Sequence, residues 1–140
     1  MQIGTSFSIS IHMLLCVEFF KNTHKITSDF IASSVHTNPV IIRKLMVQLK
    51  KAGIISTAAG TGGIDLTRKA SKISFLDIYK AVEPVKGGEL FKIHQNAEQS
   101  CPVGSKIDSL LSVFFVEAQN SMEKKLAAYS LQDILDKLND

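Results

Sequence analysis

The sequence predicts a mainly helical protein with one small β-hairpin and a long helix near its C-terminus. Three observations lead to this α+β fold class. Apolar residues recur at helical spacing in several separate segments of the 140-residue chain. The stretch IISTAAGTGGIDLT, residues 54–67, instead places two β-branched runs on either side of glycines, as a hairpin does. Helical spacing then runs from about Lys106 to Ala128, which predicts a helix of roughly 35 Å.

Two helices are expected in the first third of the chain. Residues 7–20 are apolar on most faces, and their length favours a buried helix over a strand. Cys16 lies inside this run, so we expect it to serve only in packing. Thr27 is expected to cap a short second helix, with Asp29 in the first turn, where the helix dipole favours a carboxylate.

The segment HTNPVIIRKLMVQLKKAGI, residues 36–54, gives the clearest helix prediction. Asn38 suits the N-cap, Pro39 the first helical position, and Gly53 the position just after the last turn. The spacing of the remaining residues divides this helix into two faces. The expected inward face holds Ile42, Leu45, Leu49 and Ala52, and the outward face holds Arg43, Lys44, Val47, Gln48 and Lys51.

The glycine stretch is not expected to bind a nucleotide. A phosphate-binding loop places its glycines between a strand and a helix, usually with a lysine after them. Here the glycines lie in a turn at 59–62 between strands expected at 54–58 and 63–67, and no lysine follows. A surface hairpin is therefore the better interpretation.

The second half is expected to hold three helices and a long loop. Ser74 with Asp77, and Ser130 with Asp133, are spaced as capping boxes that each open a short helix. Pro84 is expected to end the first of these helices. Residues 85–104 show little periodicity and are expected to form a loop before the long helix that begins at about residue 106.

The charge is divided unevenly along the chain. Residues 1–72 hold nine Lys and Arg against three acids, a net charge of +6, whereas residues 73–140 hold seven against ten, a net charge of −3. A basic N-terminal half suits a polyanionic partner. A short helix, a basic helix and a glycine-tipped hairpin, in that order, predict a winged helix-turn-helix. The basic helix would enter the major groove of double-stranded DNA and the hairpin tip would follow its backbone.

Five segments resemble the Rrf2 family of bacterial winged-helix transcriptional regulators, and YwnA-like members look most similar. These are FSISIHML (7–14), ITSDFIASSVHTNPVIIRKLMVQLKKAGII (26–55), GTGGIDLTR (60–68), ISFLDIYKAVE (73–83) and CPVG (101–104). The resemblance implies a homodimer whose long helices cross. It implies a DNA-binding domain at 1–84, a sensor-type loop at 85–104 and dimerisation helices at 105–140. The expected dimer interface holds Leu110, Leu111, Phe114, Phe115, Ala118 and Met122.

Two departures from the family pattern limit what the resemblance implies. The family wing usually has an Arg before its glycines and a Tyr after them, where this chain has Ala58 or Ala59 and Ile64. Wing contacts are therefore expected to be weaker and to come from the backbone amides of Gly62 and Gly63. Sensor members carry three cysteines in the loop before the long helix. This chain has only Cys101 there, so no iron–sulfur cluster or other cofactor is expected.

The DNA contacts are expected on the outward face of the basic helix. Arg43 suits guanine and Gln48 suits adenine, because their side chains can form paired hydrogen bonds with those base edges. Lys44, Lys50 and Lys51 would contact phosphates, and Ser8 and Ser10 are further candidates for phosphate contact. The expected DNA-binding set is Thr37, Asn38, Val40, Arg43, Lys44, Gln48, Lys51, Gly62 and Gly63.

Cys101 is the candidate sensor residue. It precedes Pro102 and the long helix, whose N-terminal dipole would lower the pKa of a thiol, and Lys106 is close in sequence. The plain alternative is a small apolar residue in a loop. The four histidines have no metal-site spacing, and no catalytic triad or nucleophile motif is present, so neither a metal site nor an enzyme is expected.

The prediction is a cytoplasmic, homodimeric DNA-binding regulator, expected to act as a repressor on a palindromic operator. No stretch is long and apolar enough to predict a membrane span. The alternative, suggested by the weakened wing and by Asp65, is a winged-helix module that binds another protein and has lost sequence-specific DNA binding.

Overall fold

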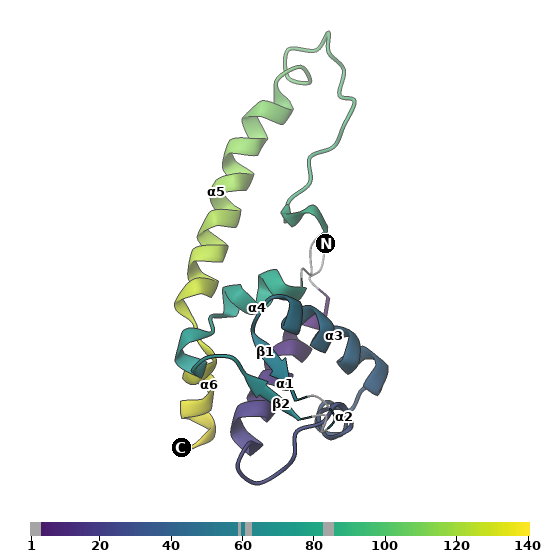
Figure 1. Cartoon of the computed structure of the whole chain (residues 1–140). Helices are drawn as coiled ribbons and strands as arrows, with labels where there is room; N and C mark the ends of the chain where they lie inside the picture. Colours follow the sequence, from purple (N-terminus) through teal and green to yellow (C-terminus); the bar gives the residue numbers. More distant parts are fainter. Residues whose placement is uncertain (1–3, 59, 61–62, 83–85) are drawn as a thin grey trace.

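Figure 1 shows the computed structural model of the chain, which describes residues 4–58, 60, 63–82 and 86–140. The predicted fold class is confirmed: the protein is mainly helical, with one two-stranded hairpin and a long helix near the C-terminus. The elements in order are α1 (Ser6–Phe20), α2 (Ser28–Val35), α3 (Pro39–Lys51), β1 (Ile55–Thr57), β2 (Ile64–Leu66), the 3-10 turn η1 (Ala70–Lys72), α4 (Phe75–Val82), the 3-10 turn η2 (Lys86–Gly88), α5 (Ile107–Ala128) and α6 (Leu131–Leu138).

The predicted caps fix where the helices begin. The Thr27 hydroxyl accepts a hydrogen bond from the backbone N–H of Phe30 at 3.1 Å, which starts α2. Ser74 and Asp77 form the expected capping box, because each side chain accepts a hydrogen bond from the other residue's backbone N–H at 3.0 Å. Ser130 and Asp133 form a second capping box at the start of α6. Pro84, predicted to end α4, lies outside the described residues.

The end of α3 has the geometry that its glycine predicts. Gly53 has a φ of +78°, a left-handed conformation that costs a glycine little. Its N–H donates to the Lys50 carbonyl at 3.0 Å, and the N–H of Ile54 donates to the Leu49 carbonyl at 3.0 Å. These two bonds make a Schellman motif, which turns the chain sharply from α3 into β1.

The hairpin is antiparallel and short. Ile55 pairs with Leu66, Ser56 with Asp65 and Thr57 with Ile64. Ile55 and Ile64 are buried, which anchors one face of the hairpin against the helices.

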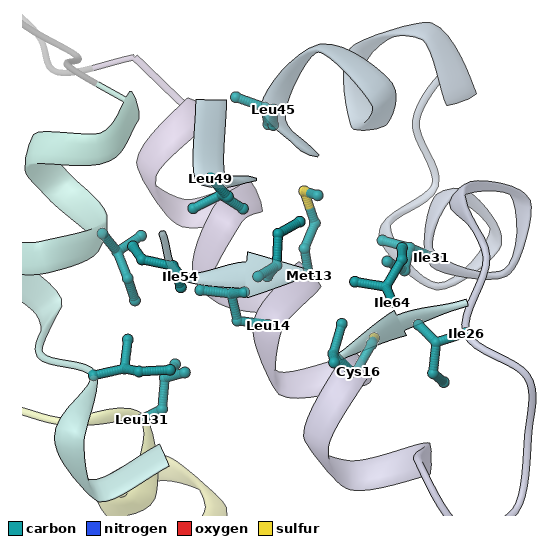
Figure 2. Close-up of a cluster of buried hydrophobic side chains, with 14 of the residues drawn as sticks. Met13, Leu14, Cys16, Ile26, Ile31, Leu45, Leu49, Ile54, Ile64 and Leu131 are labelled. Carbon is teal, nitrogen blue, oxygen red and sulfur yellow. The ribbon is translucent and has the colours of Figure 1, made fainter. Parts of the chain in front are cut away.

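One hydrophobic core joins the two ends of the chain. Figure 2 shows buried side chains converging from α1 (Leu14), α3 (Leu49) and the hairpin (Ile64), with Leu131 of α6 among them. Leu131 and Leu135 are both buried, so α6 packs beside α1 in the same core as the N-terminal elements. The core holds Met13, Leu14, Cys16, Val17, Ile26, Ile31, Ala32, Ile42, Leu45, Leu49, Ile54, Ile55, Ile64, Ala70, Ile73, Ile78, Val82, Leu131 and Leu135.

One predicted core position is wrong. Ala52 was placed on the inward face of α3 by spacing, but it is exposed. Lys51 is the last residue of α3, and Ala52 lies at its C-cap, where the chain turns toward Gly53. Ala52 keeps a right-handed helical φ of −77°, and by helical spacing it lies beside the exposed Ile41, at the edge of the buried face of α3.

Helix α5 projects from this core. Figure 1 shows it extending away from α3 and the hairpin, with the loop after η2 running along it and turning back at its N-terminal end. None of its residues is buried. Its C-terminal end is tied to α4, because the N–H of Phe75 donates to the Tyr129 carbonyl at 2.9 Å and the N–H of Leu131 donates to the Ile73 carbonyl at 3.1 Å. No helix in the described part of the chain is long and apolar enough to span a membrane.

Candidate nucleic-acid interface

The outward face of α3 is basic and accessible. Arg43, Lys44 and Lys51 are exposed, and Gln48 is half-buried, while Ile42, Leu45 and Leu49 on the opposite side fill the core. Among the residues that the structure describes, no acidic side chain forms an ion pair with Arg43, Lys44 or Lys51. These three cations are therefore available to an external anion.

The N-terminus of α3 is fixed by its own side chain. The Asn38 Oδ1 atom accepts a hydrogen bond from the N–H of Val40 at 2.8 Å, which satisfies one of the helix's first amides. Thr37 is half-buried, and its N–H donates to the Ala32 carbonyl at 3.2 Å. Both residues thus hold the turn between α2 and α3, and DNA contact by either stays a prediction.

The hairpin is held against α3 by polar side chains. The Lys50 Nζ atom donates to the Thr57 hydroxyl at 2.8 Å, so Lys50 bridges α3 and β1. The Thr67 hydroxyl donates to the Gly53 carbonyl at 2.6 Å. These contacts tie the last turn of α3 to β1, and the residue after β2 to the turn that follows α3.

Arg68 extends this connection to α4. Its Nε atom donates to the Lys72 carbonyl at 2.8 Å, and its guanidinium pairs with the Asp77 carboxylate at 3.1 Å. Partial burial acts to raise the pKa of Asp77. The hydrogen bonds to Ser74 and the Arg68 guanidinium outweigh that effect and hold the pKa below its ordinary value.

The tip of the hairpin is described only in part. Gly62, a predicted DNA contact, lies outside the described residues. Gly63 is half-buried, and its carbonyl accepts a hydrogen bond from the N–H of Ala58 at 2.9 Å. Asp65 is exposed on β2, where it lines a shallow hollow with Lys21, Arg68 and Lys69, so it adds a negative charge to the hairpin.

Ser10 was wrongly predicted to contact phosphate. It is fully buried, whereas Ser8, two residues earlier in α1, is exposed. In α1 the buried residues Met13, Leu14 and Val17 lie three, four and seven positions after Ser10, so they share its face toward the core.

The predicted dimer residues divide into two groups. Leu110 and Phe114 are 57% and 67% exposed, and Ala118 is exposed beside them. Leu111, Phe115 and Met122 are half-buried. Phe115 faces its own loop, where its ring lies 5.2 Å from that of Phe91. The first group leaves an apolar stripe on α5 with no covering residue in the described part of the chain.

Cys101 is exposed at the turn before α5, and the cause of its acidity differs from the prediction. The pKa of its thiol lies below the ordinary value because the backbone N–H groups of Gly104 and Val103 are hydrogen-bonded to the sulfur. The Gly104 nitrogen lies 3.4 Å from the Sγ atom. Helix α5 begins only at Ile107, so the amides of the turn have the effect that was expected of the helix dipole. Cys16, by contrast, is buried, as predicted.

Comparison with known proteins places the chain among transcriptional regulators. A family model described as "Rrf2: Iron-dependent Transcriptional regulator" matches residues 3–137. A candidate HTH-type transcriptional regulator of Bacillus subtilis, YwnA, is 39% identical over 98% of this chain and 99% of its own length.

Two solved structures have the same fold over most of their length. A candidate DNA-binding protein is 35% identical with a TM-score of 0.75, covering 93% of this chain and 98% of that chain. A candidate transcriptional regulator from Lactobacillus plantarum is 25% identical with a TM-score of 0.77, covering 96% and 90% of the two chains.

The family description names iron, but the residues described here do not make a site for it. No group of three His, Cys, Asp or Glu side chains in the described ranges could hold a metal ion. Cys101 is the only cysteine of its loop, whereas an iron–sulfur cluster takes about four soft ligands. The donor set of one chain therefore does not fit a cluster, and its absence stays a prediction.

Proposed function

The chain belongs to the Rrf2 family of HTH-type transcriptional regulators, which are not enzymes, and on that premise we propose that it is a homodimeric repressor acting in the cytoplasm. Each protomer inserts α3 into the major groove of one half-site of a palindromic operator. The observation that carries this proposal is the row of exposed cations on one face of α3, Arg43, Lys44 and Lys51, which pair with no acidic side chain among the described residues.

The residues on this face of α3 would contact different parts of the DNA. Arg43 suits guanine O6 and N7, and Gln48 suits adenine N6 and N7. Lys44 and Lys51 neutralise phosphates, and the amides of Gly62 and Gly63 would add backbone contacts from the hairpin. The Lys50 ammonium donates a hydrogen bond to the Thr57 hydroxyl, so its role is to hold the hairpin beside α3.

Dimerisation would supply the second α3 that binds the other half-site of the operator. The exposed Leu110, Phe114 and Ala118 on α5 support pairing of two copies through this helix, because an apolar stripe of this kind is stable in water only when it is covered. Cys101 lies in the turn before α5 begins at Ile107, so we expect modification of its exposed thiol to act on the pairing helix rather than on the DNA contacts of α3.

The test is DNA binding by the double variant Arg43→Ala with Lys44→Ala. The wild-type chain should bind the promoter of its own operon, with affinity falling steeply as salt rises. The variant should lose at least about tenfold in affinity and show a smaller salt slope, since it neutralises fewer phosphates. Fluorescence anisotropy measures both, and Lys92→Ala, an exposed charge in the loop, is the matched control.

The alternative function is a protein-binding module, which the exposed Asp65 on the hairpin favours. The same double variant separates the two functions. An interaction module would keep its partner and would bind all duplexes equally weakly, whereas the repressor would lose its operator.

A further inference from the structure

Two aliphatic side chains lie among the cations on the exposed face of α3, and a third exposed one, Ile41, lies at the edge of this face beyond Gln48. Val40 is 60% exposed and Val47 is 66% exposed. Neither valine contributes to the core, and β-branched residues slightly disfavour a helix. Single exposed apolar residues are common on proteins, but these two share a face that is otherwise basic.

The two valines lie at the centre of that face. At 100° per residue, Val40, Lys44, Val47 and Lys51 fall within a sector of about 60°, and Arg43 and Gln48 flank it on opposite sides. The long side chains of lysine and arginine can extend outward to phosphates while their stems lie along the surface. A valine is short, so it contacts only a surface that comes close to the centre of α3.

The floor of the major groove has one apolar group, the C5 methyl of thymine. We propose that Val40 and Val47 are specificity residues, and that each packs against the methyl group of a thymine in the operator half-site. The two positions are seven residues apart, about 10 Å along α3, which corresponds to thymines about three base pairs apart. The inference rests on the proposed DNA-binding function.

DNA suits this surface better than an apolar protein segment does. Arg43, Lys44 and Lys51 surround the valines, and no acidic side chain in the described part of the chain neutralises them. A protein partner that covered the valines would bury these cations unless it carried matching carboxylates, and unpaired burial of charge is costly. A DNA groove offers methyl groups on its floor and phosphates on both sides.

The experiment removes single methyl groups from DNA. The full-length chain first selects duplexes from a randomised library. In the selected duplex, each thymine of one half-site is then replaced by deoxyuridine, which lacks only the C5 methyl. We expect two positions, about three base pairs apart, where affinity falls about fourfold, the factor for one buried methyl group. Every other thymine should tolerate the replacement.

Valine variants assign each methyl group to its partner. Val47→Ala should abolish the effect of deoxyuridine at one of the two positions and keep it at the other, and Val40→Ala should do the reverse. Such loss of coupling shows that the two groups touch. Val103→Ala, which changes a 67% exposed valine in the loop, is the matched control and should leave both effects intact.

The outcomes separate this inference from the proposed function. If the chain selects a sequence but deoxyuridine costs no affinity at any thymine, the inference is overturned and sequence-specific binding stands. The same holds if the effects persist in both valine variants. If the library yields no enriched sequence, the proposed repressor function falls together with the inference.

Discussion

Helix α5 differs from the other helices and the hairpin, here called the core domain, in how it treats its apolar side chains: the core domain buries them and α5 leaves them exposed. In the core domain, α3 buries Ile42 and Leu49 completely and leaves its cations outside. Helix α5 has 22 residues and none of them is buried, although its exposed residues include Phe114. An element with a buried face is stabilised by its own chain, whereas an element with an exposed apolar face depends on something else. The core elements therefore bury their apolar faces within one chain, whereas α5 leaves its apolar stripe uncovered in the described part of the chain.

Helix α6 belongs to the core domain, although it follows α5 in the sequence. Its residues Leu131 and Leu135 return to the core beside α1. The predicted division at residue 105 grouped α5 with α6 as dimerisation helices. The packing groups α6 with the N-terminal elements, and only α5 projects.

The largest expected effect is a loss of folding stability when a core side chain is removed. Leu131→Ala removes a fully buried side chain, so we expect the free energy of unfolding to fall by about 3 kcal/mol. Leu138→Ala, in the same helix but 52% exposed, is the control and should cost less than about 1 kcal/mol. Urea denaturation followed by circular dichroism measures both. Equal effects would mean that α6 is not part of the core.

The second effect should be confined to α5. Phe114→Glu places a charge in the exposed apolar stripe, so we expect the dissociation constant of the proposed dimer to rise about 30-fold or more, as when an interface anchor is lost. Thermal stability of the protomer should change little. Sedimentation velocity measures the dimer, and Asn120→Glu, on another side of α5, is the control. A variant that dimerises like the wild type would place the interface elsewhere.

The third effect concerns the link between hairpin and α4, and it depends on pH. The pKa of Asp77 is lower in the folded protein than in the unfolded chain, so this carboxylate stabilises the fold above its unfolded pKa of about 4. That stabilisation is lost as the pH falls through the lowered folded value.

Asp77→Asn should remove this contribution. Because Asp77 and Arg68 are both partly exposed, we expect a loss of about 1 kcal/mol or less at pH 7, shrinking as the pH falls below the unfolded pKa of about 4. Thermal melts at several pH values test this. The conclusion about Asp77 would be wrong if the difference between variant and wild type were the same at pH 3 and at pH 7.

The smallest expected effect is on the reactivity of the Cys101 thiol. The amides of Gly104 and Val103 lower the pKa of Cys101, so its thiolate fraction at pH 7 exceeds that of an ordinary cysteine. Iodoacetamide should therefore modify Cys101 faster than free cysteine at pH 7, while buried Cys16 should resist it. Mass spectrometry follows both sites in one sample. If Cys101 reacted no faster than free cysteine at neutral pH, the turn would have no effect on the thiol.

Modification should also reveal whether the two regions communicate. If Cys101 is the sensor, its alkylation changes operator affinity or the dimer equilibrium. Cys101→Ser should remove that response and keep DNA binding. A response that persists in Cys101→Ser would exclude this thiol as its source.

Local signals in the sequence determined most of the elements. Thr27, Asn38, Ser74 and Ser130 each cap the helix that was predicted after them. Gly53 ends α3 as expected. These features need only neighbouring residues and the hydrogen bonds between them, so they can be found without knowledge of the rest of the chain.

Only the tertiary structure decided how those elements share surfaces. Spacing placed Ala52 inward, and the position of Ser10 near the N-terminus suggested a phosphate contact; both predictions were wrong because burial depends on what packs against a helix. The bonds of Arg68 to Lys72 and Asp77 were also not predicted from the sequence, because they form only when the turn after the hairpin brings these residues together. Sequence fixes local backbone preferences within a few residues, whereas contacts between distant segments arise only when the core closes and the apolar faces choose their partners.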